Sequence, residues 1–420
     1  MDDCASLTSP DILERAGRLR SYALCDSCLG RQFAQVAHGL ENRRRGQCIR
    51  EEMGTAPVDP GDCWLCEGLM GELEELADLV VEALEPYQYA TFLVGSRVEE
   101  ALELREGEVA AIGGDGEPIK REINREVGKR VEERTGKTVD FSRPDVTAIV
   151  NTQYNHVELD VRPLYIYGRY CKHVRGIPQT KWWCRKCRGV GCDYCGGEGK
   201  MYEESVEELV AAPVVEATGG SEESFHGAGR EDIDVRMLGH GRPFVLEVKE
   251  PRRRFVDLES LEKAINRWAE GKVTVSRLRF ADRAEIEHLK AARWTKTYRA
   301  VVSGCERGKL NEAVNALRGC YINQRTPSRV VHRRADKVRR RRVLDIHVED
   351  TAGDTATLVI RAESGTYIKE LVTGDGGRTA PSLQALTGCP LHMQNLDVIA
   401  IGDEDGQEIE RNKEQDPSDT

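Results

Sequence analysis

Eight of the fourteen cysteines fall into four pairs with the spacing CxxC, which is typical of metal ligands. The first two pairs read CDSC and CWLC and are separated by 34 residues. Each pair places two thiolates on one tight turn, so two pairs complete a closed tetrahedral S4 site with no open position for a substrate. Four buried free cysteines are the alternative. We expect a structural zinc ion held by Cys25, Cys28, Cys63 and Cys66.

The other two pairs lie in the run CRKCRGVGCDYCGGEG, which repeats CxxCxGxG and resembles the cysteine repeat of DnaJ-type chaperones. Glycines beside the pairs permit the backbone turns that bring four thiolates around one ion. A redox dithiol is the alternative for each isolated pair, but the βαβ pattern that accompanies such a motif is missing here. We therefore expect a second zinc site, at Cys184, Cys187, Cys192 and Cys195.

The composition is typical of a protein with two or three folded domains. The chain has 420 residues, of which 39% are hydrophobic and 32% charged, and no uncharged apolar stretch is long enough to cross a bilayer. The N-terminus lacks the basic start and apolar segment of a signal peptide, so a cytoplasmic location is expected. Thiols stay reduced in that compartment, which favours metal ligands over disulfides.

Hydrophobic periodicity outlines the N-terminal half. After a cysteine module at residues 1–72, apolar residues at helical spacing predict a helix over 73–84, and a strand is expected at 91–94. A second amphipathic helix is predicted over 118–136, with a proline at its start and a glycine at its end. Residues 146–170 are rich in β-branched and aromatic residues and predict two strands.

The C-terminal half has many short strands. We expect a domain of helices and strands at 73–177, a linker with the second cysteine set at 178–202, and a mixed, mostly antiparallel α+β domain at 203–402. Asp257 is positioned to cap a helix within that domain. The tail at 403–420 is charged and has few apolar residues, so we expect it to be disordered.

Asp232 is the first candidate for a catalytic group. It follows a Gly-Arg dipeptide and precedes residues of alternating polarity, which predicts a carboxylate at a strand edge beside a turn. Taken alone, an Asp next to an Arg is more typical of a surface ion pair. Asp234, two positions later, would lie on the same face of a strand.

Three motifs strengthen the case that Asp232 is catalytic. In their order along the chain they resemble the motifs of the pseudouridine synthases. These enzymes break a uridine's glycosidic bond and rejoin the base through carbon 5. GRED at 229–232 is similar to the GRxD element, KTYRAVV at 296–302 to the KxYxAxV strand, and GTYIKELVTGDGGRTAPSL at 365–383 to the third motif. The resemblance implies that Asp232 is the nucleophile, that Tyr298 stacks on the target base, that Tyr367 also faces the substrate, and that Lys369 is the basic partner. Lys369 stands where many members have Arg, so its pairing lacks a bidentate fork.

Longer runs, among them REINREVGKRVEERTGKTVDF and INQRTPSRVVHRRAD, narrow the resemblance to the archaeal tRNA pseudouridine synthases with a THUMP domain, which act on T-loop uridines 54 and 55. This implies an N-terminal zinc-stapled accessory half with a THUMP-like RNA-binding domain at 73–177, a C-terminal catalytic half, and tRNA as the substrate. It implies no organic cofactor, no membrane and no obligate protein partner. Substrate contacts are expected from Arg230, Arg325, Arg333 and Arg334.

Local charge supports an RNA partner, although the whole chain has a net charge of −11. Residues 332–343 contain seven Lys or Arg and one Asp, a net charge of +6 that can offset phosphates. Basic and aromatic residues near Trp182 suit the binding of an RNA end. One alternative is a noncatalytic zinc-containing RNA-binding protein, in which Asp232 is part of a surface ion pair. Another is a different THUMP-bearing enzyme, such as a thiolase or methyltransferase, but the sequence lacks a recognisable nucleotide or S-adenosylmethionine loop.

Overall fold

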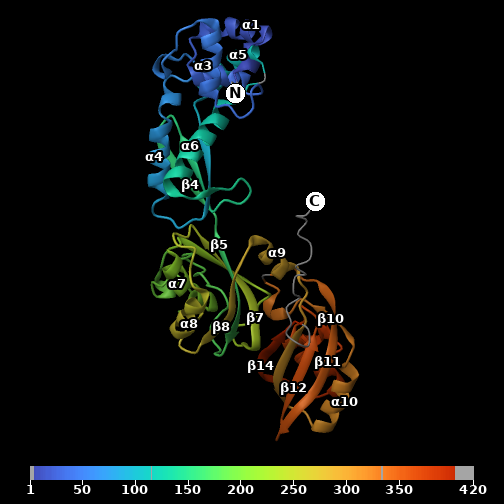
Figure 1. Ribbon diagram of the computed structural model, residues 1–420. Coiled ribbons are helices and arrows are strands. Elements are labelled where there is room, and N and C mark those ends of the chain that lie inside the picture. Colours follow the sequence, from blue (N-terminus) through green and yellow to red (C-terminus); the bar gives the residue numbers. More distant parts are fainter. Residues whose placement is uncertain (1–3, 115, 333, 403–420) are drawn as a thin grey trace. The chain divides into compact units, whose positions relative to one another are not determined.

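The computed structural model describes residues 4–114, 116–332 and 334–402. These residues form two compact units with separate hydrophobic cores (Figure 1). Unit 1 runs to Arg162 and includes Glu250–Phe255, whereas unit 2 comprises Pro163–Lys249 and the chain from Val256. Both units combine helices with sheets, as the α+β prediction requires. The tail at 403–420, predicted to be disordered, lies outside the described residues.

Unit 1 begins with helices that surround the first cysteine set. They are α1 (Pro10–Leu19), α2 (Asp26–Gly30) and α3 (Asn42–Met53). Gly30 and Gly46 let α2 and α3 approach closely, because a Cβ at either position would overlap a backbone carbonyl oxygen of the other helix. The structure also joins Cys4 to Cys48 as a disulfide, which the expectation of reduced thiols did not include.

The rest of unit 1 is a four-stranded sheet with the order β2-β1-β3-β4 and three helices. Its elements are α4 (Leu73–Leu84), β1 (Thr91–Arg97), α5 (Glu100–Gly113), α6 (Ile119–Thr135), β2 (Thr138–Val139), β3 (Val146–Asn151) and β4 (His156–Val161). The two predicted helices and the strand at 91–94 are confirmed as α4, α6 and β1, with Gly136 in the left-handed region after α6. Helix α5 escaped prediction because its apolar residues are spread around the helix: the buried Leu102, Val109 and Gly113 share one face, but the apolar Leu104 lies exposed.

The segment 146–170 holds parts of three strands, so the prediction of two strands was wrong. β3 pairs with β4 in unit 1, whereas β5 (Leu164–Lys172) pairs with β7 (Arg236–Lys249) and β8 (Val273–Ala281) in unit 2. The structure therefore divides the chain after Arg162, earlier than the boundary expected at residue 177. Sequence periodicity identifies a strand but does not determine which sheet it joins.

Unit 2 is built on a ten-stranded sheet with the order β13-β10-β11-β12-β9-β14-β7-β5-β8, and β6 pairs with β7. All neighbours are antiparallel except β14 and β7, which confirms the mostly antiparallel prediction. Its remaining elements are α7 (Val206–Thr218), β6 (Glu222–Gly227), α8 (Leu258–Trp268), α9 (Arg283–Ala291), β9 (Lys296–Ser303), α10 (Arg307–Leu317), β10 (Tyr321–Arg325), β11 (Val338–Ala352), β12 (Thr355–Ala362), α11 (Ile368–Thr373), β13 (Thr379–Ala380), α12 (Leu383–Thr387) and β14 (His392–Ile401).

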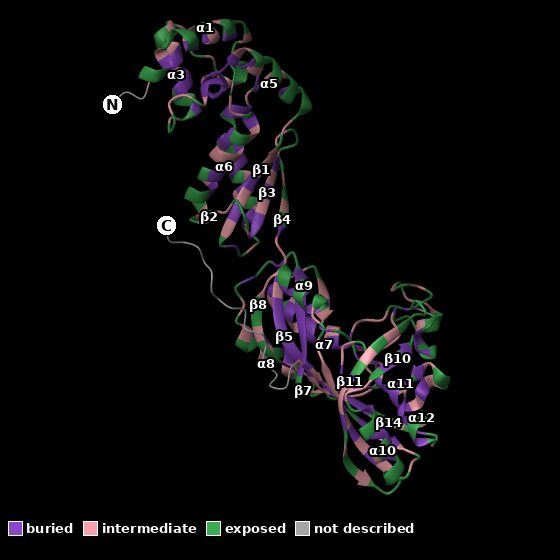
Figure 2. Cartoon of the chain, turned by 90° about the vertical axis from the view of Figure 1, so that its right-hand side faces the viewer, coloured by how far each residue is buried: buried purple, intermediate pink, exposed green. Residues whose placement is uncertain are grey.

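Helices cover parts of this sheet and bury its central strands. α7 and α8 pack together beside β8, and α10 packs on β11. Figure 2 shows β5 mostly buried within unit 2. Asp257 caps α8 as predicted, because its carboxylate accepts a 2.9 Å hydrogen bond from the Ser260 amide. Among the described residues, no helix combines the length and the apolar character that a membrane span requires.

Candidate active site

A pocket of about 690 Å³ in unit 2 gathers the three sequence motifs. It is lined by the loop between β6 and β7, the start of β9, the start of α11, and the connection between β10 and β11. The predicted residues Asp232, Tyr298, Tyr367, Lys369, Arg230 and Arg334 all line it. The sheet thus brings together residues that are far apart in the sequence.

Asp232 lies in the loop between β6 and β7, and glycine is required three positions earlier. Gly229 has φ +81°, and a Cβ there would lie 2.9 Å from Lys296 Nζ and 3.2 Å from Arg242 Nη1. On the other side of Asp232, Lys172 Nζ donates to the carbonyl oxygens of Asp232 and Ile233 at 3.2 and 3.3 Å. These contacts fix the backbone that carries the carboxylate.

A buried ionic network supports the same loop from inside the unit. Glu231 is buried and accepts hydrogen bonds from Tyr170 Oη and from Arg242 Nε, both at 2.9 Å. Arg242 also donates to the carbonyl oxygen of Ala228 at 2.7 Å. Breaking such a buried pair would leave an uncompensated charge, so the network holds the loop in one conformation.

Among the residues that the structure describes, Arg329 and Lys369 face the Asp232 carboxylate. Arg329 Nη1 lies 2.9 Å from Asp232 Oδ2, and Lys369 Nζ lies 3.4 Å from the same oxygen. Arg329 is also held by Glu370, whose Oε1 accepts from its Nε at 2.7 Å. Arg329 was missed by the sequence reasoning, since nothing distinguishes it from the other arginines of the run QRTPSRVVHRRAD.

Lys369 is shared between two carboxylates and makes its closest contacts with Asp234, at 2.8 and 2.7 Å. Burial acts to raise the pKa of Asp234, but the hydrogen bond and the charge of Lys369, together with a backbone hydrogen bond and the charge of Arg329, outweigh burial, and the pKa is lowered. The Asp234 side chain is 67% exposed against 39% for Asp232. Asp234 is thus the more solvated of the two carboxylates.

Tyr298 and Tyr367 reach the pocket from different elements. Tyr298 is buried on β9 between Ile360 of β12 and Val398 of β14. Burial raises the pKa of Tyr298 to about 12, so its phenol stays neutral. Tyr367 precedes α11, where the Gln324 side chain holds its amide and its carbonyl oxygen, each at 2.9 Å.

The four predicted arginines have different environments. Arg334 donates to Tyr367 Oη at 3.1 Å, and the Arg230 guanidinium lies over the Trp182 ring. Arg325 does not line the pocket and instead pairs with Asp336, with Nη2 and Oδ2 at 2.7 Å. Arg333 lies outside the described residues.

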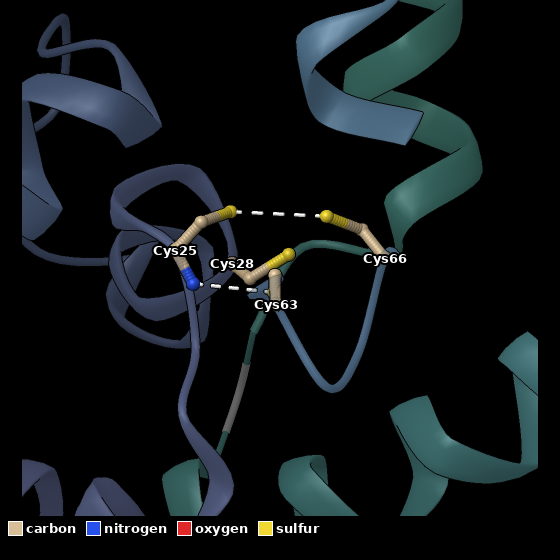
Figure 3. A group of neighbouring side chains, drawn as sticks. All are labelled: Cys25, Cys28, Cys63 and Cys66. Carbon is tan, nitrogen blue, oxygen red and sulfur yellow. Dashed lines mark hydrogen bonds between the residues drawn. The ribbon is translucent and has the colours of Figure 1, made fainter. Parts of the chain in front are cut away.

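The first cysteine set forms a buried cluster in unit 1, with its four sulfur atoms within 4.8 Å of one another, and Figure 3 shows the sulfurs of Cys25 and Cys66 pointing toward each other. The Sγ atoms of Cys25 and Cys66 are 3.8 Å apart, which matches the edge of about 3.8 Å in a tetrahedron with metal–sulfur bonds of 2.3 Å. Buried Arg31 donates to Cys28 Sγ at 3.3 Å and pairs with Glu122 of α6, which ties the cluster to that helix. The donor set and its spacing fit a metal ion.

The second cysteine set forms a comparable cluster in unit 2 that is more exposed. The Sγ–Sγ distances for Cys184 with Cys192 and for Cys187 with Cys195 are both 3.8 Å. Amides also donate to sulfur, such as that of Gly199 to Cys195 Sγ at 3.2 Å. This cluster also fits a metal ion in a closed four-sulfur site.

Family models match both units. The model described as "Pus10, C-terminal" matches residues 165–402, and "Pus10 THUMP domain, archaeal" matches residues 76–151. Among solved structures, a Cbf5-Nop10-Gar1 complex aligns with a TM-score of 0.30 and 18% identity, covering 47% of this chain and 45% of that chain. That likeness is too low to bear on fold or function.

Curated relatives match almost the whole chain. The protein named tRNA pseudouridine synthase Pus10 from Methanothrix thermoacetophila is 44% identical and covers 96% of this chain and 96% of its own length. Its namesake from Halorubrum lacusprofundi is 43% identical, with 94% and 97% covered. These matches confirm the resemblance inferred from the motifs, and the chain belongs to the Pus10 family of tRNA pseudouridine synthases.

Proposed function

We propose that this chain converts uridine to pseudouridine at positions 54 and 55 of the tRNA T-loop, with Asp232 as the nucleophile. The proposal rests mainly on one observation, the Asp232 carboxylate held between Arg329 and Lys369 in a pocket that also contains Tyr298. Family membership supports the reaction class, and the site supports the assignment of roles.

The reaction needs little more than a positioned carboxylate. The bond from ribose C1′ to N1 of uracil breaks, the bond from C1′ to C5 forms, and the proton on C5 is lost while N1 gains one. Atoms and charge balance, and nothing is oxidised or reduced. Asp232 acts either by attacking the ribose or by first removing a proton, and Arg329 and Lys369 offset its negative charge in both cases.

The target uridine has to leave its stack to reach this pocket. We assign Tyr298 as the ring that supports the detached base, because its buried position on β9 fixes its orientation. Tyr367 and Arg334, joined by a hydrogen bond, are assigned to the sugar and phosphate beside the target, and Arg230 to a neighbouring nucleotide. The Gln324 side chain holds both the amide and the carbonyl oxygen of Tyr367, which suits Tyr367 to this positioning role.

Basic strands extend the proposed RNA surface beyond the pocket. Arg340 and Arg342 on β11 lie over the exposed Tyr321 ring, with guanidinium carbons 3.9 and 5.7 Å from its centroid. Guanidinium groups stacked on an accessible aromatic ring suit contact with a nucleic acid backbone and its bases. Arg325 is assigned to the same surface, Arg333 stays a predicted substrate contact outside the described residues, and the THUMP domain in unit 1 is assigned to another part of the tRNA.

We assign zinc to both cysteine clusters, since closed four-sulfur sites of this size are typical of structural zinc. Zinc there would supply no chemistry to the reaction and would only stabilise the surrounding loops. The residues that hold it are the eight cysteines of the two sets.

The test is a mass-spectrometric map of pseudouridine in an unmodified tRNA transcript treated with the purified chain. We expect pseudouridine at 54 and 55, and none with Asp232→Ala, whereas Asp234→Ala keeps measurable activity. Folding of both variants is checked by circular dichroism. Retained activity in Asp232→Ala, or modification elsewhere in the tRNA, would overturn the respective part of the proposal. A chain that binds tRNA but forms no pseudouridine would be a noncatalytic RNA-binding protein.

A further inference from the structure

Trp182 lies two residues before the second cysteine set, yet it lines the same pocket as Asp232. Basic and aromatic residues near Trp182 are predicted to bind an RNA end, and the structure places Trp182 in unit 2. The guanidinium carbon of Arg230 lies 5.1 Å from the centroid of the Trp182 ring. Since Arg230 is only two residues from Asp232, the indole borders the proposed reaction site.

The cysteine module holds Trp182 in this place. The Met201 amide donates to the Trp182 carbonyl oxygen and the Cys184 amide to the Gly199 carbonyl oxygen, both at 2.8 Å, and Trp183 forms a β-bridge with Lys200. These contacts join the two ends of the module on either side of the four cysteines. Tyr202 then packs its ring edge-on against Trp182, with centroids 5.4 Å apart. The residue that carries the indole is therefore joined by backbone hydrogen bonds to the far end of the cysteine module.

We propose that Trp182 and Arg230 form a stacking subsite for an unpaired nucleobase next to the target uridine, and that the second cysteine module exists to hold this subsite. The inference rests on the proposed function, because it assumes that an everted uridine occupies the Asp232 pocket. Trp182 is then a residue that determines specificity, and the second cysteine module gains a role although it takes no part in the reaction itself.

Chemistry favours a base as the occupant. When one nucleotide leaves the stack, its neighbour loses a stacking partner, and single-stranded RNA recognition replaces such partners with aromatic rings and arginine planes. The Trp182 indole and the Arg230 guanidinium over its face offer both kinds of stacking partner. The Trp182 side chain is only partly buried and faces the pocket, so a flat ligand can reach it.

The experiment uses a T-loop stem-loop RNA with 2-aminopurine on the 3′ side of the target uridine. In the binding measurements every variant also carries Asp232→Asn, so that the RNA stays unconverted. In the turnover measurements the same variants are made in the native chain. Stacking quenches 2-aminopurine, so we expect brighter fluorescence in the Trp182→Ala complex and about tenfold weaker binding. Trp182→Phe is expected to restore most of the quenching.

The matched control is Tyr194→Ala. Tyr194 belongs to the same module and has Lys186 over its ring at 4.7 Å, but it is exposed and does not line the pocket. We expect its fluorescence and affinity to match the parent. The double variant Cys184→Ser, Cys187→Ser is expected to lose one metal ion and to reproduce the Trp182→Ala fluorescence.

The outcomes separate the two proposals. If the native chain forms no pseudouridine, the proposed function fails, whatever the fluorescence shows. If it forms pseudouridine but folded Trp182→Ala, with unchanged metal content, matches the parent in fluorescence and affinity, the stacking subsite is wrong. If Trp182→Ala has the expected effect and the double cysteine variant has none, the positioning role of the module is wrong.

Discussion

The guanidinium of Arg329 lies closer to the Asp232 carboxylate than the ammonium of Lys369 does, at 2.9 Å against 3.4 Å. Arg329 is anchored on its other side by the buried Glu370, whereas Lys369 makes its shortest contacts with Asp234. The nearest cation of the site thus comes from the connection between β10 and β11 and not from the third motif.

Replacing Arg329 is therefore expected to impair the reaction more than binding. Arg329→Ala is expected to lower the single-turnover rate of pseudouridine formation by about 100-fold, because it removes a positioned charge at the reacting group. Arg329→Lys keeps the charge but cannot contact Asp232 and Glu370 at the same time, as the guanidinium does, so an intermediate rate is expected. Arg307→Ala, an exposed arginine at the start of α10, is the control. A rate within threefold of the parent in Arg329→Ala would rule out this role.

Tyr298 is expected to act through its ring and not through its hydroxyl. Its pKa, raised to about 12 by burial, keeps the phenol neutral throughout the assay range. Tyr298→Phe is expected to retain most activity and stability, whereas Tyr298→Leu is expected to lose about tenfold in turnover because it removes the stacking face. Leu is preferable to Ala, which would leave a cavity costing about 3–5 kcal/mol in the free energy of unfolding. Equal activity of the Phe and Leu variants would contradict the stacking role.

The sequence alone identifies those parts of the site whose residues lie within short motifs of neighbouring residues. CxxC spacing predicts both cysteine clusters, and the three motifs name Asp232, Tyr298 and Lys369, which the structure brings into one pocket. Arg329 could not be predicted, because its place depends on how β10 and β11 pair. The sequence links Trp182 to RNA binding, but its place beside Asp232 could not be predicted, because it depends on how the cysteine module folds back onto unit 2. Arg325 and Arg329 look alike in the sequence, but Asp336 holds the first while the second reaches Asp232.

The stability of unit 2 is expected to depend on pH through Lys296. Burial, followed by the nearby charge of Arg242, lowers the pKa of Lys296 to about 7. The unfolded chain, with an ordinary lysine pKa near 10.4, therefore binds more protons between about pH 7 and 10, and stability gains from this group as pH rises through that range. Lys296→Met is expected to raise the melting temperature more at pH 6 than at pH 10. Equal shifts at both pH values in calorimetry would contradict the lowered pKa.

Loss of metal from the two clusters is expected to affect stability unequally. Cys28→Ser and Cys187→Ser are each expected to bind one metal ion where the parent binds two, as counted by native mass spectrometry. Cys28 is fully buried and accepts from Arg31, whose charge would lose a partner, so this variant is expected to melt at a clearly lower temperature. Cys187 is partly exposed, and its replacement is expected to change the melting of unit 2 less. Two metal ions retained in either variant would contradict the assignment of that cysteine to a metal site. A larger loss of stability in Cys187→Ser than in Cys28→Ser would show that the buried cluster is not the one that stabilises the fold more.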